Sequence, residues 1–261
     1  MKLNHLILQA SRKLLNQGKP IQSRKWQGTQ LKNPMFETIK VYLGPAQMPE
    51  SIADLVSEVM PNLPWAEDHF KERVSGNPTN PGEEYKNWPF WKGQSDVMMD
   101  KGTKFSHTYQ ERFWPKQANM NETEITDGYI KFGIRYEYGD LDDVVSLLAG
   151  DPDTRQAYLP IFFPEDTGAV HGGRIPCTLG YLFQIREDYL HISYYIRSCD
   201  YYRHFRDDIY MAVRLVHTII DYLKNQDPEQ FKYLKPGLFD MHIGSLHIFN
   251  HEVSKLKKEL A

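Results

Sequence analysis

Cys177 is the side chain of this sequence best suited to nucleophilic chemistry. It lies in "RIPCTLGY", directly after a proline and at the start of a strand-like run, with Arg174 three residues before it. A thiol attacks as its thiolate, and nearby positive charge favours that form. The alternative is that Cys177 is a small buried apolar residue, as many unpaired cysteines are. The segment alone is compatible with both interpretations.

The stretch "YYIRSCDYYRHFRDD", residues 194–208, offers groups that could bind a charged ligand. Arg197 and Ser198 end a strand, and a guanidinium beside a hydroxyl suits a phosphate or a carboxylate. An ordinary surface ion pair fits Arg197 about as well. Asp207 and Asp208 precede a helix, where acids commonly serve as N-caps; a functional role requires one of them to point inward.

A zinc site is the chemistry that "HIGSLHIFNH" could suggest, since His247 and His251 are four residues apart. The flanking pattern is strand-like, no acid is placed as in His-Glu-x-x-His, and no cysteine is near. We therefore predict no metal.

Composition limits the class of protein. The 261 residues are 41% hydrophobic and 25% charged, which is typical of a globular domain. A net charge of -3 gives no reason to expect nucleic acid or an acidic membrane as a partner. The N-terminus has polar residues within its apolar run, unlike a signal peptide, and no stretch reaches the ~18 apolar residues of a membrane span. Two cysteines without Cys-x-x-Cys spacing favour a reducing, cytoplasmic setting.

Hydrophobic periodicity gives the elements that must position these residues. Apolar residues at helical spacing predict helices over 3–16, 50–60 and 208–223. Alternation predicts a hairpin over 178–197 and strands at "FETIKVYLG" and "GLFDMHIGSLHIF". The proline- and tryptophan-rich segment 61–92 is predicted to form long ordered loops. We predict one α+β domain, residues 1–261, with a mainly antiparallel sheet packed by helices.

Together, these segments resemble the thymidylate synthase superfamily, and within it the phage deoxycytidylate (dCMP) hydroxymethylases. "PCTLGY" matches the nucleophile segment, "RSCD" the phosphate-binding strand end, "FRDD" the base-reading segment beyond it, and "GSLHIF" the nucleoside-binding strand. Weaker matches are "SRKWQGT" and "SHTYQERF". The order and spacing of four motifs over residues 155–251 are far more specific than any single motif.

The resemblance implies a role for each matched residue. Cys177 is expected to be the nucleophile, and Arg197, Ser198 and Arg24 to bind the 5′-phosphate. Arg155 in "DTRQA" is expected to reach the partner's phosphate across the interface of a homodimer formed through the sheet. His247 is expected to contact the sugar, and Tyr109 to order water and protons near the base. Asp200 is expected to lie on the folate side. A glutamate of "GEEYKNW", preferably Glu84, is expected to organise water.

Position 208 is implied to choose the base. The synthases have an asparagine there, which suits uracil, whereas this sequence has Asp208. A protonated carboxyl can donate to cytosine N3 and accept from its amine; alternatively the base is protonated and the carboxylate accepts twice. Either arrangement fits cytosine and leaves uracil with a mismatched acceptor, which costs about 1–3 kcal/mol or more.

The expected reaction joins dCMP, 5,10-methylenetetrahydrofolate and water to give 5-hydroxymethyl-dCMP and tetrahydrofolate. Thr178 and Ile196 stand where synthases commonly have histidine and glutamine, and both departures favour water over hydride. Phe249 and Gln156 stand where the family generally has a sugar-binding tyrosine and a phosphate-binding arginine. These two departures leave open a CMP substrate.

Other readings of the sequence remain open as well. A C5-methylase acting on dUMP or dCMP would share the resemblance and the nucleophile. A non-catalytic nucleotide-binding or scaffold protein would retain the fold, as Phe249 and Gln156 suggest. A cysteine hydrolase is the weakest alternative, because no His/Asn pair is placed to activate Cys177.

Overall fold

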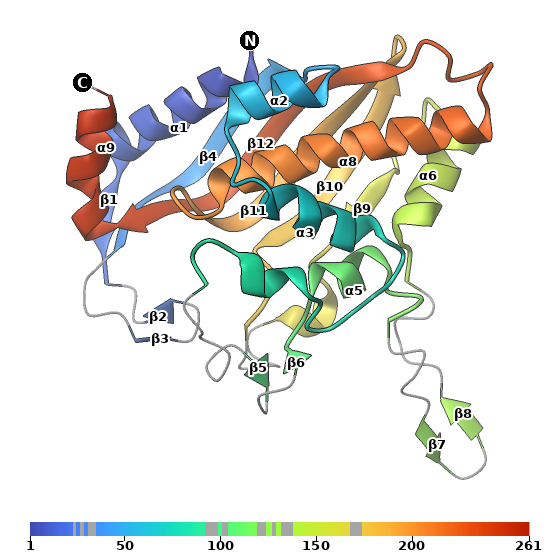
Figure 1. The fold of residues 1–261 in the computed structure, drawn as a ribbon, viewed down its shortest axis with the longest axis horizontal. Helices are drawn as coiled ribbons and strands as arrows, with labels where there is room; N and C mark the ends of the chain where they lie inside the picture. The colour runs from blue at the N-terminus through green and yellow to red at the C-terminus, as the bar shows by residue number, and fades with distance from the viewer. Residues whose placement is uncertain are drawn as a thin grey trace.

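A six-stranded mixed sheet forms the centre of the computed structural model (Figure 1). Its order is β1 (Lys19–Ile21), β4 (Met35–Gln47), β12 (Lys235–Phe249), β11 (Tyr189–Asp200), β10 (Thr178–Arg186) and β9 (Tyr158–Pro160). Strands β11 and β12 run parallel, and every other neighbouring pair in this sheet is antiparallel. The prediction of an α+β fold with a mainly antiparallel, mixed sheet is confirmed.

The structure describes residues 1–22, 35–91, 104–118, 138–167 and 174–260, and the backbone of a few short strands between them. These strands form three small ladders away from the main sheet: β2 (Lys25–Trp26) with β3 (Thr29–Gln30), β5 (Met99–Asp100) with β6 (Lys104–Phe105), and β7 (Glu124–Thr126) with β8 (Tyr129–Lys131).

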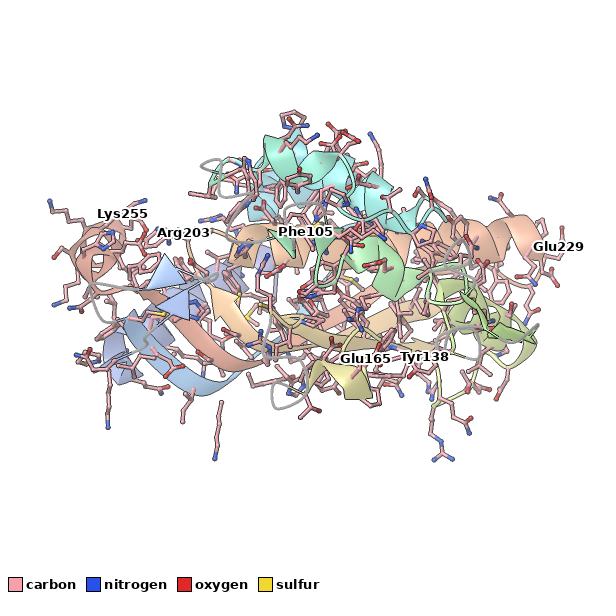
Figure 2. The ribbon with its side chains drawn as sticks, turned by 90° about the horizontal axis from the view of Figure 1, so that it is seen from below. Phe105, Tyr138, Glu165, Arg203, Glu229 and Lys255 are labelled. Atoms are coloured by element: carbon pink, nitrogen blue, oxygen red, sulfur yellow. The ribbon has the colours of Figure 1, made fainter. Side chains whose placement is uncertain are left out.

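Helices cover one face of the sheet (Figure 1). They are α1 (Leu3–Gln17), α2 (Ile52–Val59), α3 (Trp65–Val74), α5 (Tyr109–Phe113), α6 (Leu141–Gly150), α8 (Phe205–Gln226) and α9 (Val253–Glu259), with 3-10 turns η1 (Glu84–Asn87), η3 (Pro164–Asp166) and η4 (Asn250–Glu252). Figure 2 shows Arg203 and Lys255 at one end of the molecule and Glu229, which follows α8, at the other. In the parts of the chain just described, no helix is long and apolar enough to cross a membrane.

Helix α8 crosses the sheet because its apolar residues recur every three or four positions. Ile209, Val213, Val216 and Ile220 are all buried against the strands. The helix begins at Phe205, three residues before the predicted start, so Asp207 and Asp208 lie inside its first turn. Neither acid is therefore the N-cap, which is His204, although both place the expected negative charge in the first turn.

Helix α3 corrects the prediction that residues 61–92 are loops. The prolines of this segment lie outside the helix, and Trp65, Ala66, Phe70 and Arg73 form its buried side. Acidic residues in the first turn and basic residues in the last turn interact favourably with the helix macrodipole and so stabilise the helix. Counting prolines over the whole segment obscured a ten-residue helix between them.

A break in the inside–outside alternation occurs at the same level in three neighbouring strands. Two successive residues outside the core separate buried ones, and the backbone of Lys40 has a positive φ of 54°. Because the strands break together, their pairing register continues unchanged across the break. Such a step bends a strand and re-aims the side chains beyond it. The pairs are Ile39–Lys40 in β4, Gly244–Ser245 in β12 and Arg197–Ser198 in β11.

The sheet face away from the helices carries a row of aromatic side chains. His242 lies between Tyr42, with ring centroids 5.0 Å apart, and Tyr195, at 4.8 Å. Tyr158 continues the row from β9, with its ring 6.4 Å from that of Tyr195. Tyr42 is 43% exposed and Tyr158 is 41% exposed. This face therefore carries a connected row of partly exposed aromatic rings, which is a common feature of interaction surfaces.

Candidate active site

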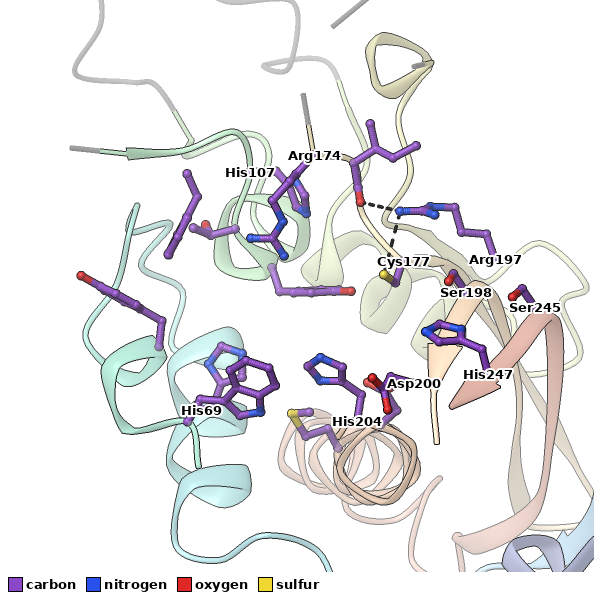
Figure 3. Close-up of a pocket in the computed structure, with 18 of the residues that line it drawn as sticks. His69, His107, Arg174, Cys177, Arg197, Ser198, Asp200, His204, Ser245 and His247 are labelled. Carbon is purple, nitrogen blue, oxygen red and sulfur yellow. Dashed lines mark hydrogen bonds between the residues drawn. The ribbon is translucent and has the colours of Figure 1, made fainter. Parts of the chain in front are cut away.

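A cavity of about 530 Å³ lies beside the bent ends of β11 and β12 (Figure 3). Its size is within the usual range of small-molecule sites. Seven residues singled out from the sequence line it together: Tyr109, Cys177, Arg197, Ser198, Asp200, Asp208 and His247. They come from α5, the segment before β10, β11, α8 and β12, so the fold gathers them from distant parts of the chain.

Cys177 is held in place by Arg197 of the neighbouring strand. The Arg197 backbone N–H donates to the Cys177 carbonyl at 2.8 Å. Its guanidinium donates to the carbonyls of Pro176 at 2.8 Å and Ile175 at 2.9 Å, and its Nη2 lies 3.9 Å from Cys177 Sγ (Figure 3). The same side chain therefore fixes the segment and brings positive charge to the sulfur.

Cys177 is exposed and lines the cavity. Desolvation by the cavity walls raises the pKa of Cys177, whereas Arg197 and Arg174 lower it. A thiolate would therefore depend on these two guanidinium groups.

Three hydroxyl groups meet at Thr178, the residue that follows Cys177. Thr178 Oγ1 lies 3.2 Å from Tyr109 Oη and 2.8 Å from Tyr194 Oη, within hydrogen-bonding distance of both. Thr178 and Tyr194 are almost fully buried, while Tyr109 lines the cavity. Through the Tyr109 hydroxyl group, this hydrogen-bonded set can relay a proton or orient water in the cavity.

Polar side chains at the strand ends form one wall. Asp200, His247 and Glu37 are cross-strand partners on β11, β12 and β4. Ser198 and Ser245 form the cross-strand pair two residues earlier on β11 and β12. Cross-strand partners share a face, and so do residues two apart on a strand, so all five side chains project from the same face of the sheet. Figure 3 shows Ser198, Ser245 and His247 gathered near Cys177.

Asp208 faces the cavity from the first turn of α8. Its Oδ2 lies 3.7 Å from Cys199 Sγ, and the backbone of Asp208 donates to the carbonyl of His204. Burial raises the pKa of Asp208 to about 7, although Arg73 opposes the rise. The adjacent Asp207 turns away and accepts from the backbone and side chain of Asn62 at 2.7 and 2.8 Å. Thus one acid supports the fold and the other reaches the site.

Four histidines line the cavity, and three of them, His69, His107 and His204, were missed in the sequence analysis. Burial lowers the pKa of His69 to about 4 and of His107 and His204 to about 3, so their imidazoles are neutral at pH 7. Burial likewise lowers the pKa of His247 to about 4. His69 could have been found by recognising α3, the helix between the prolines of residues 61–92.

Arg73 was missed for the same reason. It is 5% exposed, lines the cavity, and places its guanidinium 4.0 Å from the centroid of the Tyr109 ring. Its Nε is buried and has no hydrogen-bond partner in the described part of the chain. It therefore provides buried positive charge at the same end of the cavity as Tyr109.

Three of the site residues inferred from the sequence are not among those lining the cavity. Glu84 lies in η1, where its Oε2 accepts from Asn87 at 3.0 Å. Arg155 is exposed on the segment before β9. Arg24 lies outside the described residues. Their roles stay predictions.

His251 does not join His247 in a metal site. It stacks on Phe249, with ring centroids 5.7 Å apart, while His247 faces the cavity. Within the described residues, no group of three or more potential ligands from His, Cys, Asp and Glu is placed to hold a metal ion.

Comparison with known families agrees with the geometry of the cavity. The family model described as thymidylate synthase matches residues 82–261, which is more than half of the chain. The chain belongs to the thymidylate synthase family. No curated protein matches it.

Membership in the thymidylate synthase family indicates a folate-dependent transfer of a one-carbon unit to carbon 5 of a pyrimidine nucleotide. The family uses methylenetetrahydrofolate, and the residues present fit a flat heteroaromatic ring. Beyond the strand ends, the cavity is lined by aromatic side chains, which provide stacking surfaces: Trp65, Tyr85, Trp88, Trp91 and Phe105.

Proposed function

We propose that this protein is a dCMP 5-hydroxymethylase. The observation that carries the proposal is the presence of Asp208 and Cys177 on one cavity, an acid to read the base and a thiol to attack it. The remaining cavity wall supports the assignment, because Arg197 and Ser198 can take a phosphate while His247 faces the space between phosphate and base.

Asp208 would select cytosine through its proton. With a pKa raised by burial to about 7, the carboxyl keeps a proton for a substantial fraction of the time at neutral pH. In that form it donates to N3 of cytosine and accepts from the 4-amino group. Uracil presents N3–H and a carbonyl oxygen at the same positions. The carboxyl O–H would then face a second donor, and the carboxyl C=O a second acceptor, so neither hydrogen bond would form.

Cys177 would activate the base covalently. Its sulfur bonds to carbon 6, and the electron pair of the 5,6 double bond makes carbon 5 nucleophilic. Methylenetetrahydrofolate, when bound, supplies the one-carbon unit that carbon 5 takes up. After carbon 5 loses its proton and tetrahydrofolate leaves, water adds to the exocyclic methylene carbon and gives up a proton. Release of the sulfur from carbon 6 then frees 5-hydroxymethyl-dCMP.

The hydroxyl groups of Thr178, Tyr109 and Tyr194 support water as the nucleophile that adds to the methylene carbon. Tyr109 lines the cavity and can hydrogen-bond a water molecule there, while Thr178, itself bonded to Tyr194, orients the Tyr109 hydroxyl group. Thr178 thus acts from behind the cavity wall, through the Tyr109 hydroxyl group.

We also propose that the protein works as a homodimer joined through the aromatic face of the sheet. The row of Tyr42, His242, Tyr195 and Tyr158 offers aromatic side chains of the kind enriched at protein–protein interfaces. Arg155 is exposed and does not line the cavity of its own chain, as expected of a residue that serves the partner's phosphate.

Tritium release from carbon-5-labelled nucleotides tests the proposal. Wild-type protein and Cys177→Ala are given dCMP, CMP or dUMP with and without methylenetetrahydrofolate, and the product is weighed by mass spectrometry. We expect Cys177-dependent release from dCMP and a hydroxymethylated product. A 5-methyl product, or preferred release from dUMP, would instead identify a C5-methylase, and preferred release from CMP a ribonucleotide enzyme.

A non-catalytic nucleotide-binding role is the outcome that would overturn catalysis altogether. Phe249 and Gln156 motivate it, because Phe249 lacks the hydroxyl group and Gln156 the positive charge that the resemblance expects. In that case dCMP would bind, as measured by calorimetry, but no tritium would be released with any of the three nucleotides.

A further inference from the structure

Glu37 is a carboxylate of the cavity wall that the reaction described above does not use. It lies on β4, directly opposite His247 of β12, and both residues line the cavity. Side chains of directly opposed residues are about 5 Å apart at Cβ. A ligand group that touches His247 therefore lies within reach of Glu37.

The Glu37 carboxylate keeps capacity to accept further hydrogen bonds. In the described part of the chain, its one hydrogen-bond partner is Ser245, whose hydroxyl donates to Oε1. An ionised carboxylate has about four acceptor positions on its two oxygens. Ser245 thus orients the group and leaves the second oxygen for a ligand.

The neighbouring acid, Asp200, is already occupied. Its Oδ1 accepts from the backbone N–H groups of Tyr202 and Arg203, both at 3.1 Å, and both of its oxygens lie 3.2–3.3 Å from the Arg203 guanidinium. Further along the same face, Met35 and Phe249 offer no polar side-chain atom. Of the two acids on this wall, Glu37 is therefore the one with capacity left to accept from a hydroxyl group.

We propose that Glu37 determines recognition of the sugar by accepting a hydrogen bond from its 3′-hydroxyl group. This rests on the proposed function, which places the phosphate at Arg197 and Ser198 and the base at Asp208. The sugar then lies between them, beside His247 and Glu37. Ser245 acts as a positioning residue that holds the carboxylate.

The test compares binding of dCMP with binding of 2′,3′-dideoxycytidine 5′-monophosphate, which lacks only the 3′-hydroxyl group. Calorimetry on the full chain requires no turnover. Wild-type protein should bind dCMP more tightly by on the order of tenfold or more, as expected for a hydrogen bond to a charged group. Glu37→Ala should bind the two nucleotides nearly equally, and Ser245→Ala should retain only part of the difference.

Two controls separate this loss from misfolding and from a general change in charge. Thermal unfolding must show that Glu37→Ala is folded, and Glu37→Gln, close to isosteric, should keep part of the discrimination through its amide oxygen. Glu50→Gln, an exposed acid that pairs with Lys235 away from the cavity, should behave as wild type.

The failure of this inference is distinguishable from that of the proposed function. If wild-type protein binds the two nucleotides equally, or if Glu37→Ala keeps the full difference, Glu37 does not read the 3′-hydroxyl group while the enzyme assignment stands. If none of dCMP, CMP and dUMP binds, the proposed function fails, and the inference with it.

Discussion

At the scale of single residues, Asp208 shows how a fold changes the meaning of a side chain. Two successive acids lie in the first turn of α8, yet Asp207 is satisfied by Asn62 and Asp208 faces a cavity. The same burial that raises the pKa of Asp208 gives it a proton to donate near neutral pH. Its chemistry therefore depends on its position in the helix turn, which the family resemblance indicated and the local pattern of charges did not.

Replacing Asp208 by asparagine should change the choice of base. The amide donates and accepts in the arrangement that suits uracil, so the ratio of kcat/KM for dCMP to that for dUMP should fall by about 10-fold or more. The measurement is tritium release from both nucleotides. An unchanged ratio would show that Asp208 does not read the base, and Asp221→Asn, on the exposed side of the same helix, is the matched control.

The same substitution should change the pH dependence of stability. The pKa of Asp208 is higher in the folded chain, so the folded state holds an extra proton between about pH 4 and pH 7. This acid therefore destabilises the wild-type protein progressively as pH rises through that range. The free energy of unfolding of Asp208→Asn, relative to wild type, should increase by about 1–3 kcal/mol from pH 4 to pH 8. Urea denaturation at both values checks this, and a constant difference would contradict it.

At the scale of elements, patterns that repeat along one segment were predictable from the sequence. The alternation of Leu190, Ile192, Tyr194 and Ile196 gave β11 its buried face, and α8 followed from its apolar spacing. Helix α3 was missed because prolines flank it closely. The contributions of Glu37 and Arg73 to the cavity depend on which distant elements meet, and no local pattern contains that information.

Arg197 connects two elements, and its replacement should show that it positions the nucleophile. Arg197→Lys keeps the charge but cannot donate to the carbonyls of Ile175 and Pro176 while also approaching the sulfur. We expect kcat to fall about 100-fold or more. The pH dependence of the rate at which iodoacetamide alkylates Cys177 should also differ between Arg197→Lys and wild-type protein.

Arg186→Lys, on the other strand of the hairpin and away from the cavity, is the control for Arg197→Lys. If Arg197→Lys lowers phosphate affinity but leaves the alkylation profile of Cys177 unchanged, Arg197 serves the ligand alone.

At the scale of the whole molecule, the proposed dimer makes a prediction about mixed subunits. Cys177→Ala and Arg155→Ala should each be nearly inactive as pure dimers. A refolded mixture should regain activity, because a mixed dimer contains one site with both Cys177 and the partner's Arg155.

Tritium release from dCMP, measured against mixing ratio, checks this prediction. Activity no higher than the sum of the two parents would contradict a shared site, and Tyr42→Glu, which places charge on the aromatic face, should abolish the recovery.

The common break in alternation has a consequence for how this chain can vary. Beyond Lys40, Gly244 and Arg197, three strands turn their side chains over in unison, and Glu37, His247 and Asp200 consequently lie on the same face. Deleting one residue in a single strand would invert only that strand's share of the wall. Changes of length at this level are therefore tolerated only if three segments, separated by 156 and 45 residues of sequence, change together. Point substitutions, by contrast, can alter the wall one side chain at a time.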